Sequence, residues 1–259
     1  MKPSLLIAFI LFCLPFTAFA VKLSPIYHAE ILVVSQTNDA REQAVKDGLL
    51  QVLIRISGNP DIDKNPAIRA ALRKAEYFVQ EYSYLPDSRD SSQYQLKINY
   101  EPNDVKRLLQ KAKVGSGENH PLILVWLNVI DNQHNFDVIS NETKGTVFDK
   151  MTQEGNKYGL PVIFPMMDVD DINLVSSDDI SAMNIPVLQE AAKRYRPQGL
   201  LIGEIEENDN ACQSHWKLLM KDNQWDWKIE NKTMDNVITI VMNQVSKVIS
   251  GDGTAKGSH

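Results

Sequence analysis

The sequence predicts an α+β fold made of two small mixed domains, and three observations lead to this prediction. The polar, glycine-containing stretch 115–119 separates two patterns of strand-like and helix-like segments. Before it, the order strand, helix, hairpin, helix suits a layer of helices on one face of a sheet. After it, near-continuous apolar strands alternate with helices, which favours a partly parallel sheet that antiparallel strands extend.

The first domain is expected over residues 21–114. A strand at 26–35 precedes a helix that Asn38 or Asp39 caps and that Gly58 ends. The apolar positions of this helix recur at helical spacing, namely Ala44, Val45, Leu49, Val52, Leu53 and Ile56. The remaining elements of this domain are a helix at 66–74, hairpin strands at 77–85 and 94–100, and a helix capped by Asn103 or Asp104.

The second domain is expected over residues 120–250, after the linker at 115–119. Its core elements are apolar strands at 121–129, 160–166 and 200–205, with helices at 143–157 and 185–195 between them. Alternating segments at 215–220 and 225–229 predict the antiparallel extension. A closing helix is expected to bury Met234, Val237, Ile238, Val241, Val245 and Val248.

The first twenty residues have the composition of a signal peptide. Lys2 provides a positive start, an apolar run covers residues 5–14, and residues 18–20 form a small-x-small cleavage site. The apolar run is roughly half as long as a bilayer-spanning helix requires, so we expect cleavage at that site instead of an anchor. The sequence thus predicts a signal peptide at 1–20, a periplasmic mature chain without a membrane span, and a disordered tail at 251–259.

The charge and the cysteine content restrict the partners and the covalent structure. The formal net charge of −6 argues against nucleic acid and anionic lipid as partners. Cleavage of the signal peptide would leave Cys212 as the only cysteine, which excludes a disulfide within the mature chain. Cys212 is then either a small buried residue or one half of a bridge to another chain.

The residues that carry catalysis or bind metals do not form a recognised pattern. The five histidines are dispersed, none at the two-His spacing of a helical metal site, and no cysteine pair accompanies them. Ser214 and Lys217 match the Ser-x-x-Lys pattern of serine acyltransferases, but in a strand they point to opposite faces. We therefore expect a protein that is not an enzyme and that holds no cofactor or metal.

An acidic stretch is the best candidate for a cation site. Asp168, Asp170 and Asp171 follow an apolar strand, and clustered carboxylates can bind calcium or magnesium. The spacing departs from that of an EF-hand loop, because Ile172 takes a ligand position. The alternative is that these carboxylates cap helix N-termini, where the helix dipole favours negative charge.

The tryptophans form a second candidate surface. All four lie in the second domain, and Trp225 and Trp227 share one face of their strand. Together with Trp216 they could bind a glycan or a partner protein. The alternative is aromatic pairing across strands over the closing helix. The candidate interaction residues are thus Trp216, Trp225, Trp227, Asp168, Asp170 and Asp171.

Several blocks of the sequence together resemble those of one known family. These blocks are ARxxAxxxGLxQVLxRxSGNP at 40–60, HPLILVWL from His120, LPVIFPMMD at 160–168, GLLIG at 199–203, and the spaced Trp216 and Trp227. They resemble the exported proteobacterial proteins grouped as domain of unknown function 2066. The domain order is also similar to that of the periplasmic flagellar ring protein, and the second domain to the N-terminal domain of the Tol-system periplasmic protein. The resemblance implies a scaffold module around envelope machines, including the outer-membrane core complexes of secretion systems such as Dot/Icm.

Three functions follow from these observations. The leading one is a non-enzymatic periplasmic subunit of a larger cell-envelope assembly, which docks through its sheet edges or its tryptophan face onto envelope proteins, including an outer-membrane-associated partner. The second is a periplasmic binding protein for a small ligand or peptidoglycan, with its site near Asp131, Asp168 and Glu204 at the carboxyl ends of the parallel strands. The third is a divalent-cation-dependent enzyme that uses Asp168, Asp170 and Asp171.

Overall fold

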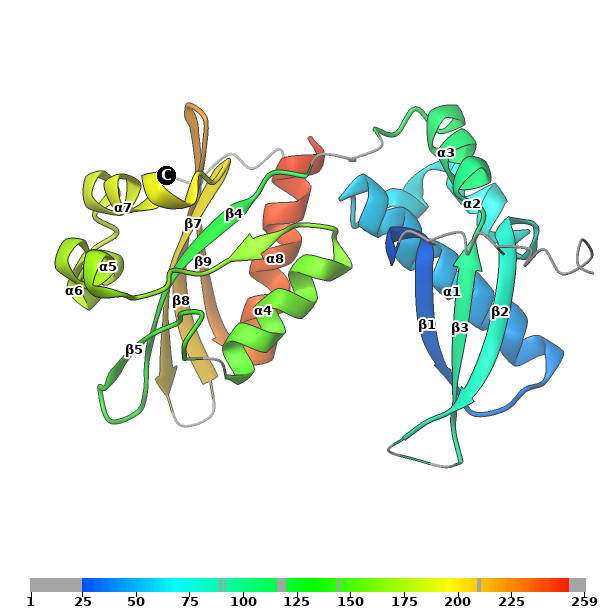
Figure 1. Cartoon of the computed structure of the whole chain (residues 1–259), viewed down its shortest axis with the longest axis horizontal. Helices are drawn as coiled ribbons and strands as arrows, with labels where there is room; N and C mark the ends of the chain where they lie inside the picture. The colour runs from blue at the N-terminus through cyan, green and yellow to red at the C-terminus, as the bar shows by residue number, and fades with distance from the viewer. Residues whose placement is uncertain are drawn as a thin grey trace, which may run out of the picture.

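The computed structural model shows two mixed α+β units, each with a sheet and a hydrophobic core of its own (Figure 1). The described residues are 25–88, 90, 92–115, 120–143, 145–208 and 211–251. The predicted α+β class, with a second sheet that mixes parallel and antiparallel strands, is confirmed. The predicted signal peptide, residues 116–119 of the predicted linker and residues 252–259 of the predicted tail lie outside the described residues.

The first domain is built on a three-stranded antiparallel sheet in the order β1–β3–β2. The strands β1 (His28–Val33), β2 (Val79–Pro86) and β3 (Tyr94–Tyr100) share one core with α1 (Asn38–Ser57), which covers one face of the sheet. β3 has the predicted bounds. β1 begins two residues later than predicted, because Pro25–Tyr27 form a 3₁₀ turn.

Helix α1 forms because its apolar positions repeat at helical spacing, and all six predicted core positions are buried. It ends at Gly58, whose φ of 67° lies in the left-handed region that glycine adopts readily. The predicted cap is wrong by one or two residues. Thr37 occupies the N-cap position, and Asn38 and Asp39 already belong to the helix.

Two shorter helices complete the first domain. α2 (Pro66–Leu72) lies between 3₁₀ turns at Ile62–Lys64 and Ala75–Phe78. α3 (Pro102–Lys111) begins after Glu101, whose carboxylate accepts a hydrogen bond from the Asn103 amide. The predicted caps Asn103 and Asp104 are therefore wrong. A proline suits the first helical position, where no amide proton is needed, and this moves the cap to Glu101.

The second domain is built on a sheet in the order β5–β4–β7–β8–β9, with β6 beside the start of β4. β4 runs parallel to β6 and β7, whereas β5, β8 and β9 run antiparallel to their neighbours. The strands are β4 (Ile123–Ile130), β5 (Phe136–Val138), β6 (Val162–Ile163), β7 (Gly199–Asn208), β8 (Ala211–Met220) and β9 (Asn223–Lys232).

Strand β6 is much shorter than the predicted strand at 160–166. β5, which the sequence analysis did not predict, pairs with residues 128–130 of β4 and leaves β6 only Ile123 and Leu124 on that edge. The chain after β6 is held by Asn141, whose side chain donates to the Phe164 carbonyl oxygen over 3.1 Å. A short hairpin after β4 therefore takes part of the edge that the third parallel strand was expected to fill.

Helices cover both faces of the second sheet (Figure 1). On one face lie α4 (Thr146–Lys157) and α8 (Met234–Ser250), and on the other lie α5 (Val169–Leu174), α6 (Ser177–Ser181) and α7 (Ile185–Ala192). The 3₁₀ turn Lys193–Tyr195 completes the predicted helix at 185–195. None of the helices in the described ranges combines the length and the apolar composition needed to cross a bilayer.

Candidate functional site

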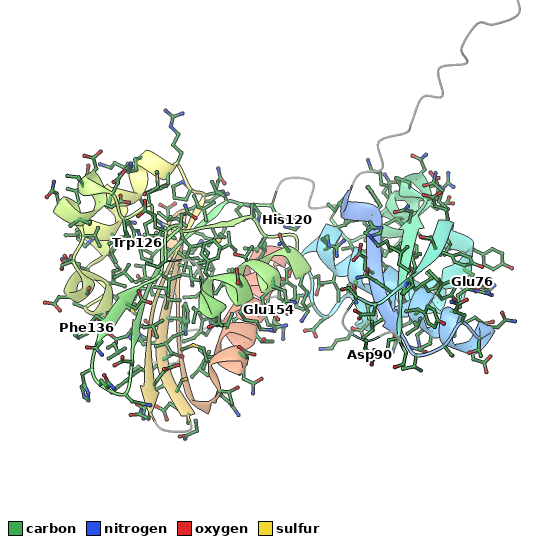
Figure 2. The ribbon with its side chains drawn as sticks, turned by 60° about the horizontal axis from the view of Figure 1, so that its bottom comes forward. Glu76, Asp90, His120, Trp126, Phe136 and Glu154 are labelled. Carbon is green, nitrogen blue, oxygen red and sulfur yellow. The ribbon has the colours of Figure 1, made fainter. Side chains whose placement is uncertain are left out.

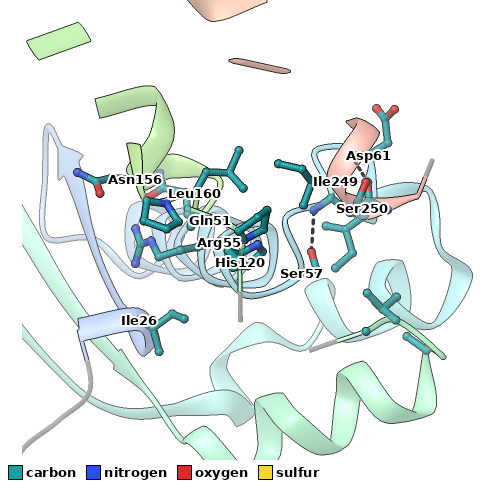
Figure 3. Close-up of a pocket in the computed structure, with 18 of the residues that line it drawn as sticks. Ile26, Gln51, Arg55, Ser57, Asp61, His120, Asn156, Leu160, Ile249 and Ser250 are labelled. Atoms are coloured by element: carbon teal, nitrogen blue, oxygen red, sulfur yellow. Dashed lines mark hydrogen bonds between the residues drawn. The ribbon is translucent and has the colours of Figure 1, made fainter. Parts of the chain in front are cut away.

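A cleft with a volume of about 2260 Å³ lies between the two domains (Figure 3). The first domain contributes β1, the C-terminal half of α1 and the end of α3. The second domain contributes residues that precede β4, β6 and β7, together with the turn between β8 and β9. The cleft therefore lies at the amino ends of the parallel strands, opposite to the carboxyl ends where the sequence analysis expected a ligand.

One side of the cleft is the junction between the end of α1 and the second domain. Figure 2 shows His120 between the two domains, and Figure 3 shows it beside Arg55 and Ser57 of α1. His120 Nε2 donates to the Ile56 carbonyl oxygen over 3.2 Å. On the same side, α8 donates a hydrogen bond to the carbonyl oxygen of Gly58. The second domain thus satisfies carbonyl groups that the end of a helix leaves open.

The edge of β1 that faces away from β3 borders the cleft. β1 pairs with β3 alone among the described strands, and His28 and Glu30 line the cleft. The Arg55 guanidinium donates to the His28 carbonyl oxygen over 2.6 Å, so this carbonyl points away from β3. Because backbone groups alternate along an antiparallel pair, the amide and carbonyl groups of Glu30 and Leu32 point to the same open edge. Such groups are a template for another strand.

The charged residues that line the cleft have the opposite net sign to the whole chain. They are four cations, Arg55, Lys64, Lys113 and Lys221, and two anions, Glu30 and Asp61, which gives +2 against −6 for the chain with histidine neutral. Asp61 already has cationic partners, because Lys64 lies 3.1 Å away and Lys247 lies 3.3 Å away. These two partners, Lys64 first, lower the pKa of the Asp61 carboxyl. The cleft therefore favours an occupant with negative charge.

The predicted acidic site anchors helix α5. Arg194 donates to both carboxylate oxygens of Asp168 at 2.7 Å and to Asp171 at 3.1 Å. The Tyr195 hydroxyl donates to the second oxygen of Asp171 over 2.5 Å. Asp171 is fully buried, Asp168 is partly exposed and Asp170 is exposed. The structure therefore brings Asp168 and Asp171 together around one guanidinium and leaves Asp170 outside this network.

The electrostatics of this network support the capping interpretation. Asp168 occupies the N-cap of α5 and accepts from the Asp171 amide over 3.1 Å. The Arg194 guanidinium, followed by this amide, lowers the pKa of Asp168 to about 2. The carboxylate in turn raises the pKa of Arg194 above its ordinary value. In the part of the chain that the structure describes, no three His, Cys, Asp or Glu side chains are grouped so that they could hold a metal ion.

The tryptophans do not form one exposed face. Trp216 is fully buried, and it packs over Gly203 so closely that a Cβ atom at Gly203 would lie 2.3 Å from the indole ring. Trp225 and Trp227 are half-buried and pack against the same core as α8. Trp227 lies directly opposite Trp216 in the β8–β9 pair. These contacts support packing across strands over the closing helix, and the position of Trp216 is incompatible with a role in docking.

The residues expected at the carboxyl ends of the parallel strands have separate roles. Asp131 accepts hydrogen bonds from the Gln133 and Asn135 amides and closes the hairpin between β4 and β5. Glu204 lies within β7, which continues beyond the predicted end of that strand. Asp168 is held by Arg194. Asp131 thus closes a turn, Asp168 caps a helix, and Glu204 lies along a strand.

The cleft could not be predicted from the sequence, because its residues come from distant parts of the chain. Arg55 and His120 lie in separate sequence blocks, at 40–60 and from residue 120, and neither belongs to a catalytic or metal-binding pattern. The available sequence signal was a pair of glycines, Gly58 and Gly159. Both have a positive φ, and a Cβ atom added at either one would lie within 3.3 Å of the His120 ring.

These observations define a two-domain α+β protein with a cleft that both domains line. Residues 20–118 match the family model of a domain of unknown function, DUF8605, and this segment contains the described first domain. No curated protein matches the chain. The predicted membership in domain of unknown function 2066 is wrong, because the family that matches is a different one. The comparisons likewise give no support to the expected similarity with the flagellar ring protein or the Tol-system protein.

Proposed function

We propose that this protein is a non-enzymatic periplasmic subunit of a cell-envelope assembly, and that it holds an extended segment of a partner protein in the cleft between its domains. The observation that carries the proposal is the edge of β1 beside this cleft, with which none of the described strands pairs. The periplasmic location rests on the signal-peptide composition of residues 1–20. The partner is an envelope protein, and an outer-membrane-associated protein belongs to this class.

The size of the cleft favours a polypeptide over a small molecule. Pockets for small ligands usually enclose about 300–1,000 Å³, whereas the cleft measures about 2260 Å³. β1 has six residues and thus spans about 20 Å. A partner strand of similar length can pair along this edge, so that main-chain hydrogen bonds provide affinity and side chains in the cleft provide specificity.

The polar side chains at the junction support a binding role. His120 and Ser57 donate to carbonyl groups of α1, and Arg55 donates to a carbonyl group of β1. These bonds hold the walls of the cleft in place. They also occupy the donor groups that acid–base or nucleophilic catalysis would use.

The alternative of a binding protein for a small ligand or peptidoglycan has less support. Its expected site included Asp131 and Asp168, and both carboxylates are already bonded within the chain. We expect muropeptides to leave the melting temperature of the purified protein unchanged. A rise in the melting temperature that depends on muropeptide concentration would favour this alternative instead.

Photo-crosslinking from β1 in the native envelope tests the proposed function. A photoreactive amino acid replaces Glu30 in the full chain, which is produced with its own first twenty residues. We expect a crosslink to one segment of an envelope protein, located by mass spectrometry. The same photoreactive residue at Gln153, which is exposed on α4, is the position control and is expected not to crosslink to that segment.

A pair of substitutions at Leu32 decides whether strand pairing is responsible for the crosslink from position 30. Leu32→Pro removes an amide at the open edge, whereas Leu32→Ala keeps it, and both remove the same half-exposed side chain. We expect the crosslink from Glu30 to disappear in Leu32→Pro and to persist in Leu32→Ala, with both proteins folded. Equal crosslinking in the two variants, or no protein crosslink from Glu30 in the unsubstituted chain, would contradict the proposal.

A further inference from the structure

Helix α5 has its polar and apolar sides reversed relative to a surface helix of a globular domain. Its buried residue is Asp171, which is 0% exposed. Aliphatic side chains on and just before the helix are exposed instead, at 47% for Met166, 73% for Val169, 61% for Ile172 and 50% for Leu174. A surface helix normally turns its apolar residues to the core and its charged residues to water. Packing within the domain does not account for these exposed aliphatic side chains.

The buried carboxylate holds this helix in one orientation. Burying a charge is costly unless it is paired and hydrogen-bonded. Asp171 receives hydrogen bonds from Arg194 at 3.1 Å, from Tyr195 at 2.5 Å and from the Met167 amide at 3.0 Å. With the Asp168 bonds to Arg194, the network ties the N-terminal half of α5 to the 3₁₀ turn after α7. Val169 and Ile172, which are three positions apart, are therefore turned outward by a polar anchor on the other side of the helix, and Leu174 is exposed at its C-terminal end.

The surroundings of this aliphatic face are acidic. Residues 166–192 contain six carboxylates and neither lysine nor arginine. Asp168 and Asp171 are paired with Arg194, and Asp179 is part of the capping box of α6. Asp170 and Asp178 are exposed, and neither forms an ion pair with another described residue. The rim of the face thus carries negative charge that the described part of the chain does not neutralise.

We propose that Met166, Val169, Ile172 and Leu174 form a docking surface for an amphipathic segment of a partner protein that carries lysine or arginine beside its apolar residues. The exposed aliphatic side chains provide the apolar contact, and the acidic rim selects a basic partner. The same rim repels an anionic lipid surface and the same face of a second copy of this chain. None of the four residues lines the cleft, so the proposal is independent of strand pairing at β1.

Binding of model peptides to the full mature chain tests this surface. The probes are a synthetic amphipathic helix of leucine and lysine and a matched helix of leucine and glutamate, both followed by fluorescence anisotropy. The double variant Val169→Asp/Ile172→Asp removes the apolar contact while it adds negative charge. We expect the basic peptide to bind the wild-type protein and to lose at least about tenfold in affinity in this variant, although electrostatic attraction increases.

A second variant and a control separate charge from apolar contact. Asp170→Asn/Asp178→Asn is expected to weaken binding of the basic peptide and to reduce its salt dependence. Gln153→Asp, on the opposite face of the sheet, is expected to leave binding unchanged, and all variants should keep the circular dichroism of the wild type. The proposal is overturned if the two peptides bind equally, if the double variant at Val169 and Ile172 binds as the wild type does, or if anionic vesicles bind the protein through these two residues.

Discussion

A Cβ atom at Gly159 would lie 2.2 Å from the backbone carbonyl oxygen of Arg55. The turn after α4 in the second domain therefore touches the last turn of α1 in the first domain, backbone against backbone. Ile54, one residue earlier in α1, packs against the cores of both domains. The junction beside the cleft is thus a close-packed contact, and we expect the two domains to unfold cooperatively.

Substitution of Gly159 by alanine is expected to disrupt this junction. Gly159 has a φ of 68°, and Gly251 has a φ of 81° with open space around it. Gly251→Ala should therefore lower the free energy of unfolding by about 1 kcal/mol, the backbone strain alone. Gly159→Ala should lower it by about 3 kcal/mol or more, because its Cβ atom also meets the Arg55 carbonyl. Urea denaturation measures both values, and equal losses would contradict a tight junction.

The Asp168–Arg194 pair makes the stability of the protein depend on acid pH. Arg194 holds the pKa of Asp168 at about 2 in the folded protein, below the ordinary value of 3.8. The pair therefore stabilises the fold fully above about pH 4, and this contribution is lost as the pH falls towards about 2. We expect Asp168→Asn to flatten the decrease in unfolding free energy over this range. Arg194→Gln should flatten it as well, and an unchanged slope in either variant would refute this role.

Trp216 and Trp225 should differ in their contributions to stability. Trp216 is 0% exposed, whereas Trp225 is half-buried at the same sheet face. Trp216→Ala is expected to lower the free energy of unfolding by about 3–5 kcal/mol, because it leaves a large cavity over Gly203. Trp225→Ala is expected to lower it by about 1–2 kcal/mol. Chemical denaturation tests the order, and a larger loss at Trp225 would show that the packing around Trp216 is different.

Cys212 is expected to be unreactive in the folded protein. It is a free, buried cysteine, and burial followed by the charge of Glu207 raises the pKa of its thiol. Both effects reduce the amount of accessible thiolate, which is the reactive form. A thiol reagent such as DTNB should label the native protein slowly and the urea-unfolded protein quickly. Equally fast labelling in both states, or a covalent dimer on a non-reducing gel, would contradict the buried position.

Several elements could be predicted because local pattern and tertiary packing agree. The six apolar positions of α1 are all buried, and Gly58 ends this helix in a left-handed conformation. The predicted caps were wrong because Thr37 takes the N-cap position of α1 without a side-chain bond, and Pro102 moves the cap of α3 to Glu101. The short helices α5 and α6 were not predicted, since acidic and polar residues interrupt the apolar periodicity there.

The candidate site depended on contacts between distant segments. β6 is short because β5 competes for the same edge of β4, and this competition has no signature within residues 160–166. Asp168 and Asp171 were predicted as one group, but Arg194, which decides their role, lies more than twenty positions away. Trp216 was counted with the exposed tryptophans because alternation along a strand does not show which face a later helix covers.

The sequence by itself determined the α+β class, the order of most strands and helices, and the apolar positions of α1, because each depends on the period of side chains along a few turns or a short strand. Only the tertiary structure decided where the cleft lies, that α5 turns aliphatic side chains outward, and that Trp216 is buried. These features depend on which segments pack together, and the burial and pairing of a side chain follow from its neighbours in space and not from its neighbours in the chain.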